Sequence, residues 1–155
     1  MKKDDWKRMI DNWEASRKYA NFKKKLNQKM QMNMNKKEIL KAIESIKEFS
    51  ALDAEDKEAF DFLDEVARNQ TSKEDIVYSL IQTLLRWHFY LLKYQLKEEY
   101  ELCAQIRDTI ELEIDECRRM IATYFIVEPG DEQMYENIKE ESLKRVTDNF
   151  NNIEE

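Results

Sequence analysis

Residues 76–96, IVYSLIQTLLRWHFYLLKYQL, decide the fold of this chain. Apolar side chains occupy almost every face of this segment, and a helix that is apolar all round is buried on several sides. The 155-residue chain also contains one Gly and one Pro, which leaves few of the turn formers that strands and their hairpins need. We therefore expect an all-α protein, a compact bundle of about five or six helices around this central helix, with a basic N-terminal helical arm.

A second helix follows after only three residues, Lys97 to Glu99. Short connections favour antiparallel neighbours, so the two segments predict an αα-hairpin. Small residues lie at the middle of one stripe of the second helix, which would let another helix approach closely. That stripe consists of Tyr100, Cys103, Ala104, Arg107, Ile110 and Ile114.

The run at residues 100–110, YELCAQIRDTI, resembles the UVR motif, the small helical hairpin of the UvrB and UvrC excision-repair proteins. The resemblance covers about residues 84–116. In that family the hairpin is a docking and dimerisation module without catalytic activity, and the resemblance implies the same role here.

The resemblance also implies a set of partner-binding residues. Tyr100 corresponds to the aromatic anchor, Ala104 to a small contact residue and Ile110 to the next core position. Cys103 stands where the family more usually has Ala. The implied set is Tyr100, Cys103, Ala104, Arg107, Asp108 and Ile110.

Charge divides the chain into a basic arm, residues 1–35, and an acidic helical bundle, residues 36–150, that contains the hairpin. Residues 1–41 hold 13 Lys and Arg against 5 Asp and Glu, whereas the rest of the chain holds 13 against 28. Such asymmetry is typical of an interaction arm attached to an acidic body.

Four interpretations of the arm remain open. It can bind nucleic acid through residues 1–41, lie on an anionic membrane, dock on an acidic protein surface, or pack on its own bundle. A membrane is the partner we least expect. The candidate binding residues of the arm are Trp6, Lys7, Ile10, Trp13, Arg17, Lys18, Lys23, Lys24 and Lys25. Of these, Trp6, Ile10 and Trp13 share one helical face with Met9 and Ala20.

Weak signals mark the helix ends. Asn35 with Glu38, Asp53, and Thr71 with Glu74 are candidate N-caps, and the Thr71–Glu74 pair fits a capping box best. The hairpin's second helix is expected to run to about Val127, before Pro129. A last helix, near residues 132–149, has a thin apolar stripe and is expected at the periphery.

Residues that carry chemistry are sparse. His88 stands alone in an apolar helix, which favours a satisfied core histidine. Cys103 and Cys117 are fourteen residues apart on one helix, about 21 Å, so they are expected as two buried thiols rather than a disulfide. We expect no metal site, no cofactor and no catalytic residues, and so no enzyme.

These patterns favour a non-enzymatic protein–protein interaction or assembly protein that uses the hairpin and the basic aromatic arm. Its expected partner is another protein or a second copy of itself. One alternative is a nucleic-acid-associated repair accessory that binds through the arm, and another is a helical, phage-encoded assembly component of a phage particle. No apolar run reaches the roughly 18 residues of a membrane span, so we expect a cytoplasmic location or the interior of a virus particle.

Overall fold

The computed structural model describes residues 34–58 and 72–154. These two ranges contain helices and no strand, which confirms the all-α class. Residues 54–58 are helical. The long helices are α3 (Lys36–Ser50), α5 (Lys73–Leu96), α6 (Tyr100–Tyr124) and α7 (Asp131–Glu154).

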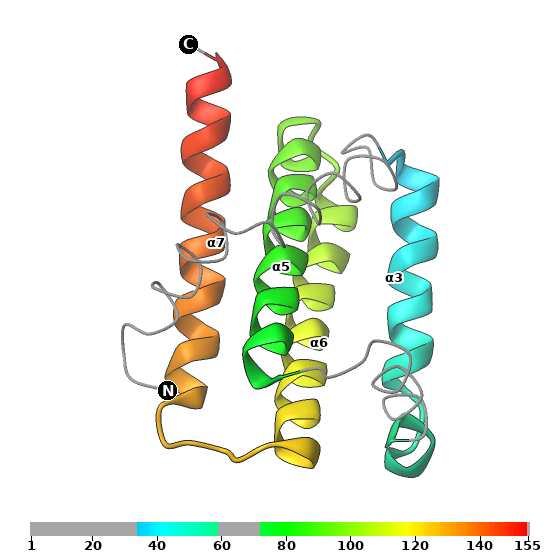
Figure 1. The fold of residues 1–155 in the computed structure, drawn as a ribbon. Coiled ribbons are helices and arrows are strands. Elements are labelled where there is room, and N and C mark those ends of the chain that lie inside the picture. Colours follow the sequence, from blue (N-terminus) through cyan, green and yellow to red (C-terminus); the bar gives the residue numbers. More distant parts are fainter. Residues whose placement is uncertain (1–33, 59–71, 155) are drawn as a thin grey trace.

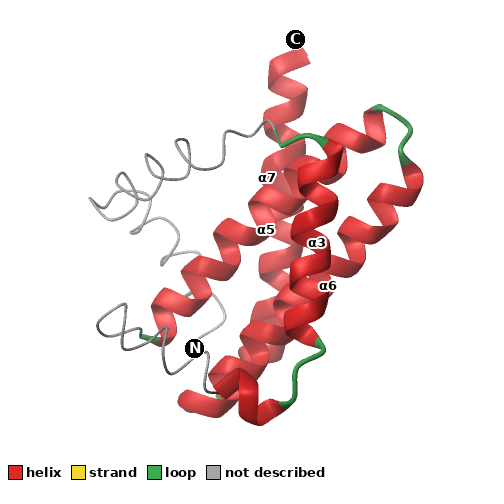
Figure 2. Ribbon diagram, turned by 90° about the vertical axis from the view of Figure 1, so that its right-hand side faces the viewer, coloured by secondary structure: helices red, strands yellow, loops and turns green. Residues whose placement is uncertain are grey.

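The hairpin of α5 and α6 forms the middle of the bundle, as Figures 1 and 2 show. The two helices run antiparallel and are joined by residues 97–99, which confirms the predicted αα-hairpin. α7 packs along α5 on one side of the hairpin, and α3 packs on α6 on the other. Every helix of this group therefore contacts the hairpin.

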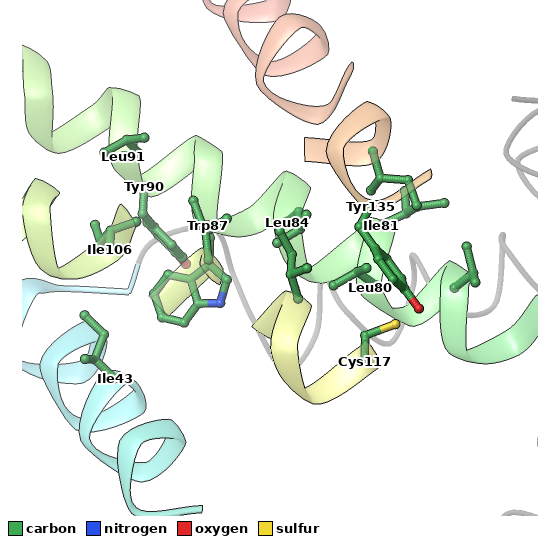
Figure 3. Packing of buried hydrophobic residues seen from close by; sticks show 14 of the residues in the cluster. Ile43, Leu80, Ile81, Leu84, Trp87, Tyr90, Leu91, Ile106, Cys117 and Tyr135 are labelled. Carbon is green, nitrogen blue, oxygen red and sulfur yellow. The ribbon is translucent and has the colours of Figure 1, made fainter. Parts of the chain in front are cut away.

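α5 supplies the largest share of the core, as its apolar pattern predicts. Leu84 is fully buried in the middle of the helix, and α3 adds Ile39 and Ile43 from the other side. Figure 3 shows Ile43 facing the Trp87 ring, while Tyr135 of α7 lies beside Leu80. Each such large side chain contributes about 1.5–3 kcal/mol when it leaves water.

α5 begins one residue later than the sequence predicts. Its N-cap is Ser72, whose Oγ accepts a hydrogen bond from the Asp75 backbone N–H at 3.2 Å. The Asp75 carboxylate accepts one from the Ser72 N–H at 3.3 Å, completing a capping box. The prediction of Thr71 with Glu74 is wrong because two overlapping patterns satisfy the same rule, and the extended backbone at Ser72 selects the second.

Two other predicted caps are confirmed. The Asn35 Oδ1 atom accepts a hydrogen bond from the Glu38 N–H at 2.9 Å at the start of α3. The Asp53 carboxylate accepts one from the Asp56 N–H at 2.8 Å, ahead of the helical residues 54–58. Both side chains satisfy backbone donors that would otherwise lack a partner.

α6 ends at Tyr124, three residues before the predicted end. Phe125 adopts an extended backbone, with φ −135° and ψ 175°. Two β-branched residues and then Pro129 follow, and neither favours a continuing helix. The short connection that results leads directly into α7.

α7 is part of the core, which corrects the expected peripheral position. Met134, Tyr135 and Ile138 belong to the same buried cluster as the α5 side chains. The helix also runs from Asp131 to Glu154, longer than the predicted 132–149. Periodicity alone underestimated its contact face because Tyr135 buries an apolar ring behind a polar hydroxyl.

An ion pair fixes the start of α7 against the start of α5. The Lys73 Nζ atom lies 3.1 Å from the Asp131 carboxylate, which is 2% exposed. The same carboxylate accepts a hydrogen bond from the Glu128 N–H at 2.9 Å. A buried carboxylate with these donors is satisfied, and it also lies at the positive end of the α7 dipole.

His88 joins α5 to α7 further along. Its Nδ1 atom lies 2.7 Å from the Ser142 Oγ atom, and both residues are 3% exposed. Burial lowers the pKa of His88 to about 4, against a smaller opposing effect of a backbone hydrogen bond at Leu84. The imidazole is therefore neutral at pH 7, and the expected satisfied core histidine is confirmed.

We predict that Asp131→Ala lowers the free energy of unfolding by about 2–3 kcal/mol, because Lys73 loses its nearest carboxylate in a largely buried place. The matched control is Glu132→Ala, which removes an exposed partner of Arg118 and should cost less than about 1 kcal/mol. Urea unfolding of both variants measures the difference. Equal losses would contradict the structural role of Asp131.

We also predict that acid weakens the fold through His88. Its folded-state pKa lies below the unfolded value of 6.5, so the unfolded chain binds the proton first and stability falls as the pH drops from 6.5 towards 4. Between pH 7 and pH 4.5 the loss should be about 2 kcal/mol larger in the wild-type chain than in His88→Leu. Urea unfolding at the two pH values tests this, and identical pH dependence would disprove it.

Candidate docking surface on the helical hairpin

The hairpin tip is a tight turn with one residue in an unusual backbone conformation. Glu98 has a φ of 58°, the left-handed region that glycine adopts most easily. The turn is held by hydrogen bonds from the Glu98 N–H to Gln95 O and from the Glu99 N–H to Tyr94 O, both 3.0 Å. A short left-handed turn brings the ends of α5 and α6 close together.

Large apolar side chains are exposed on both sides of this turn. Leu96 ends α5 and Tyr100 begins α6, and each is 64% exposed. In the described ranges, Ile126 and Val127 form the other exposed apolar pair, at the opposite end of α6. Only the pair at the tip adjoins residues that the sequence marks for partner binding.

The outer face of α6 continues from the tip. Tyr100, Ala104, Arg107 and Asp108 are all exposed, and their spacing of four, three and one residues places them on one side of the helix. Within the described part of the chain, the side chains of Arg107 and Asp108 form no hydrogen bond or ion pair. Both side chains are exposed on the outer face of α6.

The predicted stripe divides between two sides of α6. Cys103 is 1% exposed and Ile110 is 3% exposed, so both lie in the core, together with Ile114. The other predicted residues face outward. The partner-binding role of the set stays a prediction, but in this conformation only its outward members can contact a partner.

Sequence reasoning missed the strongest core positions of α6. Leu102 and Ile106 are buried almost completely, four residues apart, beside Cys103. Their apolar side chains at helical spacing were a usable signal, because they continue through Ile110 to Ile114. The true buried stripe is thus rotated away from Ala104 and Arg107.

Both thiols are structural, as expected. The Cys103 Sγ–H donates to the Leu91 carbonyl oxygen at 3.6 Å, which ties α6 to α5. Burial raises the pKa of Cys103, and it raises the pKa of Cys117 to about 12. Both cysteines are free and buried, so neither carries a thiolate at neutral pH.

The nine candidate residues of the basic arm lie outside the described residues. They are Trp6, Lys7, Ile10, Trp13, Arg17, Lys18, Lys23, Lys24 and Lys25. Their proposed contacts with a partner or with nucleic acid stay predictions.

In residues 34–58 and 72–154, no group of three or more His, Cys, Asp or Glu side chains is placed to hold a metal ion. None of the described helices combines the length and the apolar character that crossing a bilayer requires. The contact between His88 and Ser142 lies inside the core.

Comparisons with protein-family models, curated proteins and solved structures gave no match to this chain. The resemblance to the UVR hairpin therefore rests on residues 100–110 and on the αα-hairpin geometry, and it stays a prediction.

We predict that the tip tolerates glycine and rejects a β-branched residue at position 98. Glu98→Gly should change the free energy of unfolding by less than about 1 kcal/mol, whereas Glu98→Val should lower it by about 1–2 kcal/mol, because valine is strained at positive φ. Lys97→Val, at a φ of −87°, is the control and should cost less. Thermal unfolding of the three variants measures these differences. A Glu98→Val variant as stable as Lys97→Val would contradict the turn geometry.

Proposed function

We propose that this protein is a non-enzymatic interaction or assembly protein that docks a partner on the tip and outer face of the α5–α6 hairpin. The observation that carries the proposal is the exposure of Ala104 between Tyr100 and Arg107 on a helix whose opposite side is buried. A small residue in the middle of an exposed face lets another helix approach closely. The aromatic ring and the charged side chains around it supply contact area and direction.

The composition of this face supports a protein partner. Tyr and Arg are the residues most enriched at interfaces, and the exposed Leu96 extends the apolar part of the surface across the turn. Arg107 and Asp108 have opposite charges side by side, which suits a partner surface with both signs. The partner is another protein or a second copy of this chain, as the resemblance to the UVR hairpin implies.

The alternative function is binding of nucleic acid through the basic arm, supported by the 13 Lys and Arg among residues 1–41. Phosphate contacts make affinity fall steeply with salt concentration, whereas an apolar helix interface changes little. The outer face of α6 offers few cations for phosphate, with Arg107 beside Asp108 and Glu111. A phage assembly role is a third proposal and predicts self-association or association with other particle proteins.

The test is recovery of partners by the tagged full-length chain from its native cell, with and without nuclease, together with sedimentation of the purified protein. We expect Ala104→Trp to weaken partner binding or self-association at least tenfold, because the large ring blocks close approach. Its helix content should be unchanged. Ala122→Trp is the matched control, since Ala122 is an exposed alanine on the same side of α6 but about five turns from Ala104, far beyond the tip.

The outcomes separate the proposals. Loss in Ala104→Trp alone supports docking at the hairpin. Unfolding of Ala104→Trp, or binding equal to the wild type, would count against it. Recovery that disappears with nuclease or with added salt would move the function to the arm and to nucleic acid.

A further inference from the structure

α5 carries a second apolar face beside its core face. Tyr78, Leu85 and Leu92 lie seven residues apart. Phe89 lies four residues after Leu85 and three before Leu92, and Leu96 lies four residues after Leu92. Residues with this repeat lie on one side of a helix and form the seam of a helix–helix contact. We name these five side chains the α5 strip.

The described helices cover the α5 strip only in part. Tyr78, Leu85, Phe89 and Leu92 are half-buried, and Leu96 is exposed. α7 reaches the strip at Phe89, whose ring centroid lies 5.3 Å from that of Phe150. A helix face with this much apolar surface still accessible has room for one more helix.

The contact of Met34 with Tyr94 places residue 34 at the hairpin end of α5. The Tyr94 hydroxyl donates to the Met34 carbonyl oxygen at 3.4 Å, so the chain enters α3 beside the hairpin end of α5. The strip is 18 residues long, about 27 Å, and a helix over residues 6–20 would be about 21 Å long. The 13 residues between them and Met34 can span up to about 43 Å, enough to pass around α5.

The arm matches the strip in pattern. Trp6, Ile10, Trp13 and Ala20 are separated by four, three and seven residues, the same repeat as the strip. Two helices with this repeat can interlock along their whole contact. The match does not depend on the motif residues 100–110 of the UVR resemblance, although part of the strip lies in the first arm of that hairpin.

The arm and the described part of the chain carry opposite net charges. Residues 1–33 hold 10 Lys and Arg against 4 Asp and Glu, whereas the described residues hold 15 against 25. The strip's own helix carries Lys73, Arg86 and Lys93 against Glu74 and Asp75, so the opposite charge lies on the described residues as a whole. At one end of the strip, burial and then the charges of Glu74 and Asp75 raise the pKa of Tyr78. At the other end, Lys97 and then Glu98 follow Leu96 in the turn.

We propose that residues 6–20 of the same chain pack as a helix along the α5 strip, parallel to α5. Trp6 lies towards Tyr78 and Ala20 towards Leu96. The strip is then covered by a segment of the same chain. A tethered segment is present at millimolar effective concentration and therefore binds in preference to a free second copy. This inference does not require the proposed docking function of the hairpin, but the two surfaces share Leu96.

The test uses the full chain with a spin label at Ser79→Cys, an exposed position one residue from Tyr78. The chain has three tryptophans, so the indole N–H signals of Trp6 and Trp13 can be assigned by substitution to Phe. The native thiols are buried and react slowly. A label at Ala122→Cys, on the outer face of α6, is the control.

We expect the label at position 79 to reduce the Trp6 and Trp13 signals at least twofold and the label at position 122 to leave them unchanged. Trp6 and Trp13 signals of unchanged intensity with the label at position 79, or equally reduced by both labels, would overturn the proposal. Broadening in a mixture of isotope-labelled chains and spin-labelled unenriched chains would assign the strip to a second copy, and would overturn it too.

A pair of variants gives an independent reading. Leu85→Asp with Leu92→Asp should release the arm and speed tryptic cleavage at Arg17 and Lys18 roughly tenfold, since cleavage follows the population of the open form. Leu143→Asp, at an exposed leucine of α7 outside the strip, should not. Equal cleavage rates in folded forms of both variants would contradict the proposal.

Discussion

Burial of α5 from several sides is the constraint on which the rest of the structure depends. A helix with apolar residues on most of its surface has no stable arrangement on its own, because each exposed large side chain forgoes about 1.5–3 kcal/mol. α6 covers one face through a three-residue turn, which makes the covering local and fast to form. α7 then covers a flank of α5, while α3 packs on α6 and brings Ile43 towards Trp87 of α5.

Polar contacts select among the ways in which these helices could cover α5. The carboxylate of Asp131 meets Lys73 at the starts of two helices, and Lys57 meets Glu116 at 2.8 Å where residues 54–58 reach α6. His88 holds the middle of α7. Each is buried or nearly so, and a helix shifted by one turn would leave a charge or a polar atom without a partner, at a cost of about 1–3 kcal/mol. Apolar burial thus supplies the stability, and these contacts fix the register.

Structural features that many residues indicate together could be predicted from the sequence. Features that depend on a single contact could not. The buried helix α5 was predicted because about ten apolar positions in its sequence indicate it. The single stripe expected on α6 divides in the structure, because Tyr100 at the hairpin tip has no preceding turn to cover it and is exposed, whereas Cys103 is buried. The depth of α7 was missed because Tyr135 and Asp131 are polar by composition and buried by their partners. Of the candidate site, the hairpin and its outward residues were predictable, and the separation of Cys103 from Ala104 needed the structure.

The two proposed surfaces meet at Leu96, which ends the α5 strip and also flanks the hairpin tip. In the proposed arrangement of the arm, a partner that covers Leu96 and Tyr100 would touch the end of the arm. The two events are then coupled, and thermodynamic linkage requires the coupling to act equally in both directions. If the partner extends the apolar contact of the arm, each strengthens the other. If it needs Leu96 for itself, binding loosens the arm and exposes its basic residues, so that one docking event at the tip would make the charge of residues 1–33 available to a second partner.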